Sequence, residues 1–406
     1  MKNDKRILWI AICFLGLFGQ SFSQCTSGND TLFVSKIFTD KNGFTEGIEG
    51  PAVDKAGNLY VVNFQKQSTI GKVTPNGSTT IFVELPEGSV GNGIRFNRKG
   101  DMFIADYTAH NILKVDMETK DIEIYAHDDR MNQPNDLAID DHGVLYASDP
   151  NWNEGTGKIW RIDTNGTIRL LNADMGTTNG IEISPDNGTL YVNESDQHKL
   201  WAFDLSLEGQ ISNKRLLREF DNIVLDGMRC DSMGNLYISC YNKGNITIVS
   251  PQGKIIRNVK LIGDTVSNLC FGGPDGRTCY VTMVDNRNIE VFRTDIPGRS
   301  WVMNHSLSGI EKNHSSIFNK DIKLDQNYPN PFNLRTFISY HLSVCRNIQL
   351  DIYNLEGQKI TRLINGKQGP GKYRIEWDAS SYPSGIYFYR MLAGGWSVTD
   401  KMQLIK

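Results

Sequence analysis

The stretch that decides the fold is EGPAVDKAGNLYVV, residues Glu49–Val62. A polar residue and a glycine open it, and an alternating apolar segment follows. A polar turn containing Gly57 then leads into a second apolar segment with an aromatic residue at its centre. Such alternation is typical of a half-buried strand, and a turn glycine supplies the positive φ that tight hairpins need. The stretch therefore predicts a β-hairpin.

The pattern of this hairpin recurs five more times. The recurrences are spaced 41 to 47 residues apart and open at Asn92, Asn135, Asn179, Asp226 and Ser267. A third apolar run follows each hairpin, for example Ile70–Val73, and a fourth can be read in the first five repeats. Four antiparallel strands in a unit of about 40 residues are typical of a propeller blade. We therefore expect residues 31–296 to form a six-bladed β-propeller.

The sixth repeat lacks a fourth strand of its own, because Pro297 and Gly298 follow its third strand directly. The run Leu32–Phe38, upstream of the first repeat, is the candidate for the missing strand. Its pairing with the last blade would close the ring and remove two exposed sheet edges.

The N-terminus has the pattern of a secretory signal peptide over residues 1–23. Lys2, Lys5 and Arg6 precede the apolar run Ile7–Gly19, and small residues follow it. The run is too short to cross a membrane, and no other stretch approaches the roughly 18 apolar residues required. The net charge is −3, with no dense block of Lys and Arg, so nothing indicates nucleic-acid binding. We expect an exported protein without a transmembrane span in its mature chain.

Six cysteines lie beyond the predicted signal peptide. Cys25 follows Gln24, which fits a lipoprotein cleavage site poorly. Cys270 and Cys279 lie on adjacent predicted strands and could pair, although small buried thiols are the simpler interpretation. No spacing resembles a zinc site.

The last quarter of the chain predicts a second β domain. Residues 297–322 lack sustained periodicity and are interpreted as a linker. From Thr336 onward, short strands separated by Gly, Pro and Asn turns predict a small C-terminal β-sandwich over residues 323–406. The fold class expected for the whole chain is all-β, a propeller followed by this sandwich.

The residues that open the six repeats are candidates for a metal site. The first strand of each blade lines the central channel, so these residues converge although they lie far apart in sequence. They are Glu49, Asn92, Asn135, Asn179, Asp226 and Ser267. Two carboxylates with amide oxygens suit Ca²⁺ or another hard divalent cation. Asn, Asp and Ser also cap strand ends without any ligand. Glu49 favours the metal, because Glu is a poor turn residue.

The same positions carry a family resemblance. The repeats are similar to the senescence marker protein, regucalcin and gluconolactonase family of calcium-dependent lactonases, with diisopropylfluorophosphatase as a more distant relative. The matching elements are Glu49-Gly50-Pro51, Pro134-Asn135-Asp136, Asn179-Gly180, Asp226-Gly227-Met228 and the run Asn268–Gly276.

The resemblance implies a metal bound by Glu49, Asn179 and Asp226, with Asn135 completing the shell or holding substrate. A lactone carbonyl polarised by the cation would be attacked by water, with Asp226 as the proton acceptor. Asn92 and Gln133 are assigned to substrate binding at the same end of the central channel. The animal enzymes have an arginine where this chain has Gln133, which leaves the natural substrate open. The loop 149–158 could form a lid, with Trp152 as a wall, or an ordinary connection.

The C-terminal segment resembles the type A sorting domain of the type IX secretion system. The matching stretches are NYPNPFN at Asn327–Asn333, LDIYNLEGQKI at Leu350–Ile360, SGIYFYRMLAGG at Ser384–Gly395 and KMQLIK at Lys401–Lys406. The resemblance implies passage through the periplasm and release or attachment at the cell surface by that machinery. A carbohydrate-binding sandwich is the alternative.

Two other functions fit the same fold, because propellers host many activities. One is a non-catalytic propeller that binds a ligand or partner and keeps a structural calcium. The other is a metal-dependent lyase or phosphoesterase.

Overall fold

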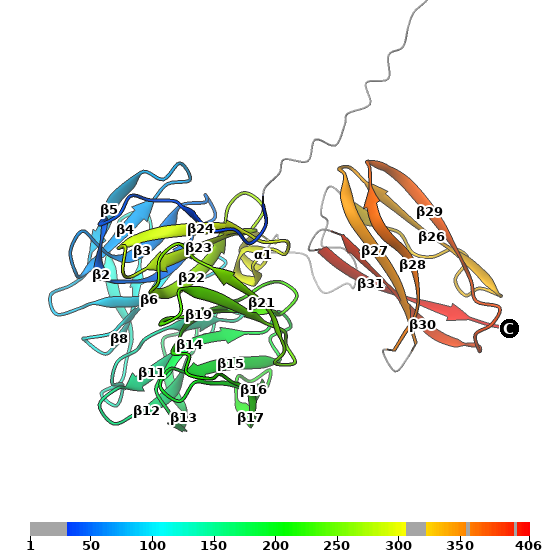
Figure 1. The fold of residues 1–406 in the computed structure, drawn as a ribbon. Helices are drawn as coiled ribbons and strands as arrows, with labels where there is room; N and C mark the ends of the chain where they lie inside the picture. Colours follow the sequence, from blue (N-terminus) through cyan, green and yellow to red (C-terminus); the bar gives the residue numbers. More distant parts are fainter. Residues whose placement is uncertain (1–30, 306–321, 355–357, 394–395) are drawn as a thin grey trace, which may run out of the picture.

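The computed structural model describes residues 31–305, 322–354, 358–393 and 396–406, so the predicted signal peptide lies outside the described residues. Residues 31–305 contain six four-stranded antiparallel sheets that follow one another around a ring (Figure 1). Among the described residues, no helix is long and apolar enough to cross a membrane. The predicted six-bladed propeller is confirmed.

The blades follow the predicted repeats. The first consists of β2 (Phe44–Val53), β3 (Leu59–Phe64), β4 (Thr69–Val73) and β5 (Thr79–Glu84). The second consists of β6 (Gly91–Phe96), β7 (Met102–Asp106), β8 (Asn111–Val115) and β9 (Ile122–His127). The third consists of β10 (Leu137–Ile139), β11 (Leu145–Asn151), β12 (Thr156–Ile162) and β13 (Ile168–Met175).

The later blades are built in the same way. The fourth consists of β14 (Thr178–Ile183), β15 (Thr189–Glu194), β16 (Lys199–Leu205) and β17 (Ile211–Glu219). The fifth consists of β18 (Leu225–Cys230), β19 (Leu236–Cys240), β20 (Asn245–Val249) and β21 (Ile255–Lys260). The sixth consists of β22 (Val266–Gly272), β23 (Thr278–Met283), β24 (Asn288–Arg293) and the N-terminal β1 (Lys36–Ile37).

The ring closes as the sequence predicted, although the closing strand is short. Lys36 pairs with Val291 and Ile37 with Glu290, so β1 lies antiparallel to β24. Ser35 Oγ donates a 2.6 Å hydrogen bond to Glu290, 255 residues away in sequence. The first and last strands of the propeller therefore share one sheet.

Apolar side chains between neighbouring blades hold the ring together. Tyr60, from the second strand of blade 1, packs at 5.5 Å between ring centroids against Phe96 of blade 2. Both rings belong to a cluster of buried residues that also contains Ile94 and Ile104. Such aromatic contacts explain the aromatic centre of the second strand in the repeat.

Part of the predicted linker folds onto the propeller. Residues Arg299–His305 form the helix α1, which contacts β22. Arg299 is buried and donates to Ile139 O at 2.8 Å and to Asn187 Oδ1 at 2.8 Å. Met303 packs into the apolar cluster that contains β10 and β11. The helix therefore belongs to the propeller.

The hairpin of blade 3 differs from the sequence interpretation, whereas Cys270 and Cys279 agree with the simpler of the two interpretations given for them. Asp149 pairs with Lys158 as part of a regular ladder between β11 and β12, so only residues 152–155 form a turn, and a loop over 149–158 is wrong. Cys270 and Cys279 are free, because Cys270 lies opposite Tyr280 and Cys279 opposite Phe271 in the β22–β23 ladder. Buried thiols are the correct interpretation.

The C-terminal domain consists of two sheets, as predicted. One contains β25 (Ile322–Leu324), β26 (Arg335–Leu342) and β29 (Gly371–Asp378). The other contains β27 (Arg346–Tyr353), β28 (Lys359–Gln368), β30 (Gly385–Ala393) and β31 (Trp396–Leu404). Residues from both sheets, including Tyr340 and Tyr389, share one buried cluster, which makes this a small β-sandwich.

Candidate functional site

The residues that open the repeats lie where the innermost strands are irregular. The ladder between the first and second strands of a blade shifts register next to Asn92, Asn179, Asp226 and Ser267. Glu49 lies between two such shifts in β2. A β-bulge bends its strand and re-aims the side chains it carries. The same local irregularity therefore recurs at five of the six openings.

The glycine after an opening residue allows adjacent blades to approach closely. Gly50 has a φ of 52°, and a Cβ there would lie 1.7 Å from Asn92 O. A Cβ on Gly180 would lie 2.5 Å from Asp226 O. A side chain at either position would push two openings apart. The polar-glycine pair in the repeat thus brings neighbouring opening residues together.

The half-buried carboxyl of Glu49 and the buried carboxyl of Asp226 influence each other. Glu49 Oε2 accepts hydrogen bonds from Gly50 N at 2.7 Å and from Asn268 Nδ2 at 2.8 Å. Burial nevertheless raises the pKa of Glu49 from 4.5 to about 7. Burial also raises the pKa of Asp226 well above 3.8, and the negative charge of Glu49 raises it further. A bound cation would remove this conflict between two carboxylates.

Asn179 presents an unused oxygen beside these carboxyls. Its Nδ2 donates to Ser195 Oγ at 3.1 Å, and a hydrogen bond from its side chain lowers the pKa of Asp226. Its Oδ1 is buried and has no hydrogen-bond partner among the described residues. Buried acceptors are normally satisfied, so this oxygen marks a place for a ligand. Asn193 and Ser195 hold the strand beneath, by donating to Asp226 O at 2.7 Å and Leu225 O at 2.5 Å.

Asn135 and Asn92 are joined by their backbone and amide groups. Asn92 Nδ2 donates to Asn135 O at 3.1 Å, and Asn135 N donates to Ser148 O at 2.8 Å. The structure thus fixes Asn135 between blades 2 and 3, and it uses the Asn92 amide to hold that position.

Gln133 lies in a small polar and aromatic group that the sequence did not reveal. Burial raises the pKa of Tyr107, and the side chains of Gln133 and Trp152, which lie beside its hydroxyl, partly offset that effect. The backbone N of Gln133 donates to Asp149 Oδ1 at 2.6 Å, and Asp149 also accepts from Trp160 Nε1 at 2.8 Å. Buried Asp149 therefore holds the backbone of Gln133 in place.

A second ring of residues lies three positions after the opening residue of each repeat. Sequence reasoning missed its role. All six are buried: Ala52, Arg95, Ala138, Glu182, Arg229 and Cys270. Three of them carry charge, which is unusual for fully buried strand positions. The signal was available, because the spacing to the opening residue is constant.

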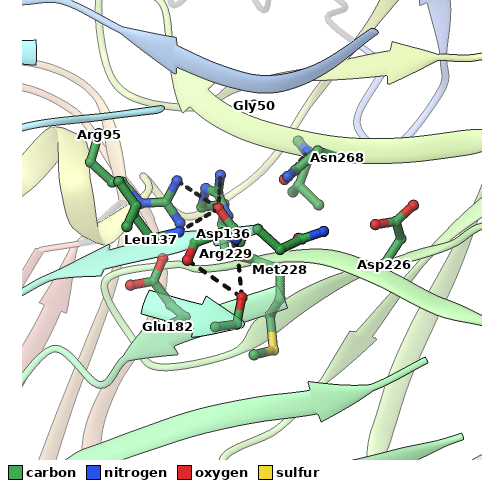
Figure 2. Close-up of polar contacts among 12 residues, drawn as sticks. Gly50, Arg95, Asp136, Leu137, Glu182, Asp226, Met228, Arg229 and Asn268 are labelled. Atoms are coloured by element: carbon green, nitrogen blue, oxygen red, sulfur yellow. Dashed lines mark hydrogen bonds and ion pairs between the residues drawn. The ribbon is translucent and has the colours of Figure 1, made fainter. Parts of the chain in front are cut away.

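Asp136 joins two of these charges. It lies between the guanidinium groups of Arg95 and Arg229 (Figure 2). Arg229 Nη1 donates to Asp136 Oδ2 at 2.7 Å, and Arg95 Nη1 lies 3.3 Å from Asp136 Oδ1. The positive charges of the two arginines lower the pKa of Asp136 against the effect of burial. Asp136 follows the opening residue Asn135, where four other repeats have glycine.

The donor set at the mouth is limited to two acids and several amides. Among the described residues, no group of three or more His, Cys, Asp and Glu side chains could hold a metal. A cation here would depend on Glu49 and Asp226 together with neutral oxygens such as Asn179 Oδ1. Such a set fits a hard cation, and it does not fit a soft metal.

Comparisons with known proteins agree on the propeller and on the C-terminal domain. Residues 48–285 match the family described as the SMP-30/Gluconolactonase/LRE-like region, and residues 326–406 match the Secretion system C-terminal sorting domain. A gluconolactonase of Zymomonas mobilis is 29% identical over 274 residues, which cover 59% of this chain and 76% of that protein. The regucalcin of Xenopus laevis is 30% identical over 217 residues, which cover 50% of this chain and 71% of that protein.

A solved structure shares the fold. The regucalcin of Agrobacterium tumefaciens, described as a calcium-binding protein, superposes with a TM-score of 0.54 at 20% identity. The match covers 63% of this chain and 95% of that one.

Proposed function

This chain belongs to the SMP-30/gluconolactonase/LRE-like family, and from that membership we propose that it is a calcium-dependent hydrolase of lactones. The observation that carries the proposal is that two mutually repelling carboxyls, half-buried Glu49 and buried Asp226, lie with the unpartnered oxygen of Asn179. A propeller without a ligand at this place would have little reason to keep them together.

The proposed cation would be held by Glu49, Asn179 and Asp226, with Asn135 completing the set. When bound, it would act as a Lewis acid on the substrate carbonyl. Carboxylate and amide oxygens favour Ca²⁺. Asn268 orients Glu49 through its 2.8 Å hydrogen bond, while Asn193 and Ser195 fix the backbone of β18 next to Asp226.

Asp226 is the proposed general base. Burial and the charge of Glu49 raise its pKa in the metal-free protein, and a bound cation would lower it again, which would leave the carboxylate without a proton and able to accept one from water. Asp226 would accept the proton of a water molecule that attacks the lactone carbonyl.

Substrate binding is proposed for Gln133, Asn92 and Asn135 at the same mouth. Gln133 is uncharged, and its neighbours Tyr107 and Trp152 offer aromatic surface with polar tips. Aromatic faces with amide groups suit a neutral, sugar-derived lactone ring.

We expect the purified protein to hydrolyse a member of a panel of aldono- and aryl-lactones with Ca²⁺ and to lose that activity with a chelator. The rate of ring opening measures both. The calcium concentration needed should increase as the pH falls below 7. Glu49 has a pKa of about 7 in the folded, metal-free protein, and protons then compete with the cation.

The outcomes separate the alternatives. Calcium binding without turnover of any lactone would support a non-catalytic propeller with a structural cation. Full activity in the presence of chelator would contradict the proposed role of the metal. A calcium requirement independent of pH would contradict the assignment of Glu49 as a ligand.

The sorting domain at residues 326–406 implies secretion or display at the cell surface. We propose that the route leads through the periplasm and the type IX machinery. Deletion of residues 323–406 should leave an active propeller inside the periplasm, which cell fractionation and a lactonase assay can measure. Continued appearance of the shortened protein in the medium would contradict the proposed route.

A further inference from the structure

Tyr241 is fixed at the end of the central channel where the repeats open. It follows the last residue of β19 directly, and its backbone N donates to Val224 O at 2.9 Å. The next residue holds the same corner, because Asn242 Oδ1 accepts a hydrogen bond from Val224 N at 3.1 Å. The backbone of Tyr241 therefore lies beside the short segment that leads into Asp226.

The side chain of Tyr241 lies close to the carboxyls of the proposed metal site. Burial raises the pKa of Tyr241, and the negative charges of Asp226 and Glu49 raise it further. Charges act on an exposed group only over short distances, because water and salt screen them. Asp226 belongs to blade 5 and Glu49 to blade 1. The phenol of Tyr241 therefore extends from blade 5 toward the channel.

The hydroxyl of Tyr241 is available to a ligand. The residue is 37% exposed, and among the described residues its hydroxyl has no hydrogen-bond partner. Other tyrosines of the propeller use their hydroxyls internally. Tyr60 donates to Asp54 at 3.1 Å, and Tyr125 donates to Asp163 O at 3.2 Å. A structural role alone thus leaves the hydroxyl of Tyr241 unexplained.

Tyr107 occupies the equivalent position in blade 2. Its backbone N donates to Val90 O at 2.8 Å, as Tyr241 N does to Val224 O. Blades 2 and 5 face each other across the ring, because the innermost strands of neighbouring blades contact one another in chain order. The proposed site is therefore bordered by a tyrosine on each of two opposite sides.

The chemistry of the phenol suits a hydroxylated ring. A tyrosine hydroxyl can donate and accept a hydrogen bond, as a sugar hydroxyl can. Its raised pKa keeps it protonated and neutral at pH 7. The lactone carbonyl would be polarised by the proposed cation and has no need of the phenol. The aromatic face beside the hydroxyl can cover the C–H groups of the same ring.

We propose that Tyr241 contacts the substrate and that its hydroxyl binds a ring hydroxyl of a sugar-derived lactone. This contact makes the site favour hydroxylated lactones over unsubstituted lactones of the same ring size. The inference rests on the proposed function, because it assigns the substrate class at the same site. A site that is built to bind a substrate hydroxyl discriminates against the analogue that lacks it, since its own polar group then stays unpaired.

Two measurements on the full-length protein with calcium test the inference. Tyr241→Phe should weaken the binding of methyl α-D-glucopyranoside by about 3–10-fold in isothermal titration calorimetry, the usual contribution of one neutral hydrogen bond. This probe has ring hydroxyls but no lactone carbonyl, so it is not hydrolysed. Tyr241→Phe should also lower kcat/KM for glucono-δ-lactone by a similar factor. It should leave kcat/KM for δ-valerolactone, which has no hydroxyl, unchanged.

Tyr125→Phe is the matched control. It removes the same group from a tyrosine of β9, an outer strand whose hydroxyl donates to Asp163 O. This variant should change neither the binding of the pyranoside nor the preference between the two lactones. Thermal unfolding with calcium would establish that both variants are folded. Tyr241→Leu, which removes the ring as well, is a second variant and should weaken pyranoside binding further.

Unchanged pyranoside binding by Tyr241→Phe would overturn the inference, and so would the absence of pyranoside binding by the unmodified protein. An equal loss of kcat/KM for both lactones would also overturn it, because the hydroxyl would then act at the reacting ester. A protein that binds the pyranoside through Tyr241 but opens no lactone would contradict the proposed hydrolysis alone. The hydroxyl-binding role of Tyr241 would then be supported.

Discussion

Asp226→Asn should lower kcat for a hydrolysed lactone by about 10²–10⁴-fold, the usual contribution of a positioned general base. The amide keeps the shape of the carboxyl but cannot accept the proton of the attacking water. It also removes one of the two negative charges at the mouth, so calcium should bind more weakly. The measurement is steady-state hydrolysis at calcium concentrations that saturate the variant.

The matched control is Asp221→Asn, an exposed aspartate shortly before the same strand, which should leave kcat unchanged. Circular dichroism and thermal unfolding with calcium would establish that both variants are folded. If Asp226→Asn hydrolyses lactones at the wild-type rate once calcium is saturating, Asp226 is a metal ligand and another group accepts the proton.

Asp136→Ala should destabilise the propeller by about 3–5 kcal/mol, because it leaves buried cations without their partner. Arg95 and Arg229 are both buried, and each loses the carboxylate that it contacts within 3.3 Å. Urea unfolding at fixed chloride and calcium measures the change in free energy.

Asp141→Ala is the control for this substitution. Asp141 also contacts two arginines, at 3.0 and 3.3 Å, but a third of its side chain is exposed. Partly exposed ion pairs contribute about 1 kcal/mol or less. Equal losses of stability in the two variants would show that burial does not strengthen the contribution of the ion pairs of Asp136 to the free energy of unfolding.

The opening residues could be predicted because each stands at the first position of a repeat that is visible in the sequence. Six segments with one pattern can be aligned from the sequence, and topology then brings their first positions to one place. The residues of the second ring could be found in the same way, because they occupy the fourth position of each repeat. Arg95, Glu182 and Arg229 stand there where a structural strand would place apolar residues. The position after the opening residue is equally informative. Four repeats have glycine there, and the other two have the polar residues Asp136 and Asn268.

Other contacts could not be predicted, because they join segments outside the repeat. Tyr107 and Trp152 come from different blades and meet at Gln133 only after folding. Helix α1 is too short to show a clear apolar period, and it is held by the buried side chain of Arg299. Such contacts depend on three-dimensional geometry for which the spacing of residues gives no signal.

The pairing of β1 with β24 has a consequence for the order of folding. Five blades can form from hairpins between neighbouring segments. The sixth is complete only when Lys36 and Ile37 pair with β24, at the far end of the domain. Contacts of such long sequence separation form late. Until then, the edge of β24 is open to pairing with other chains. A few residues near the N-terminus thus serve as a latch that ends the period in which the propeller is most prone to aggregation.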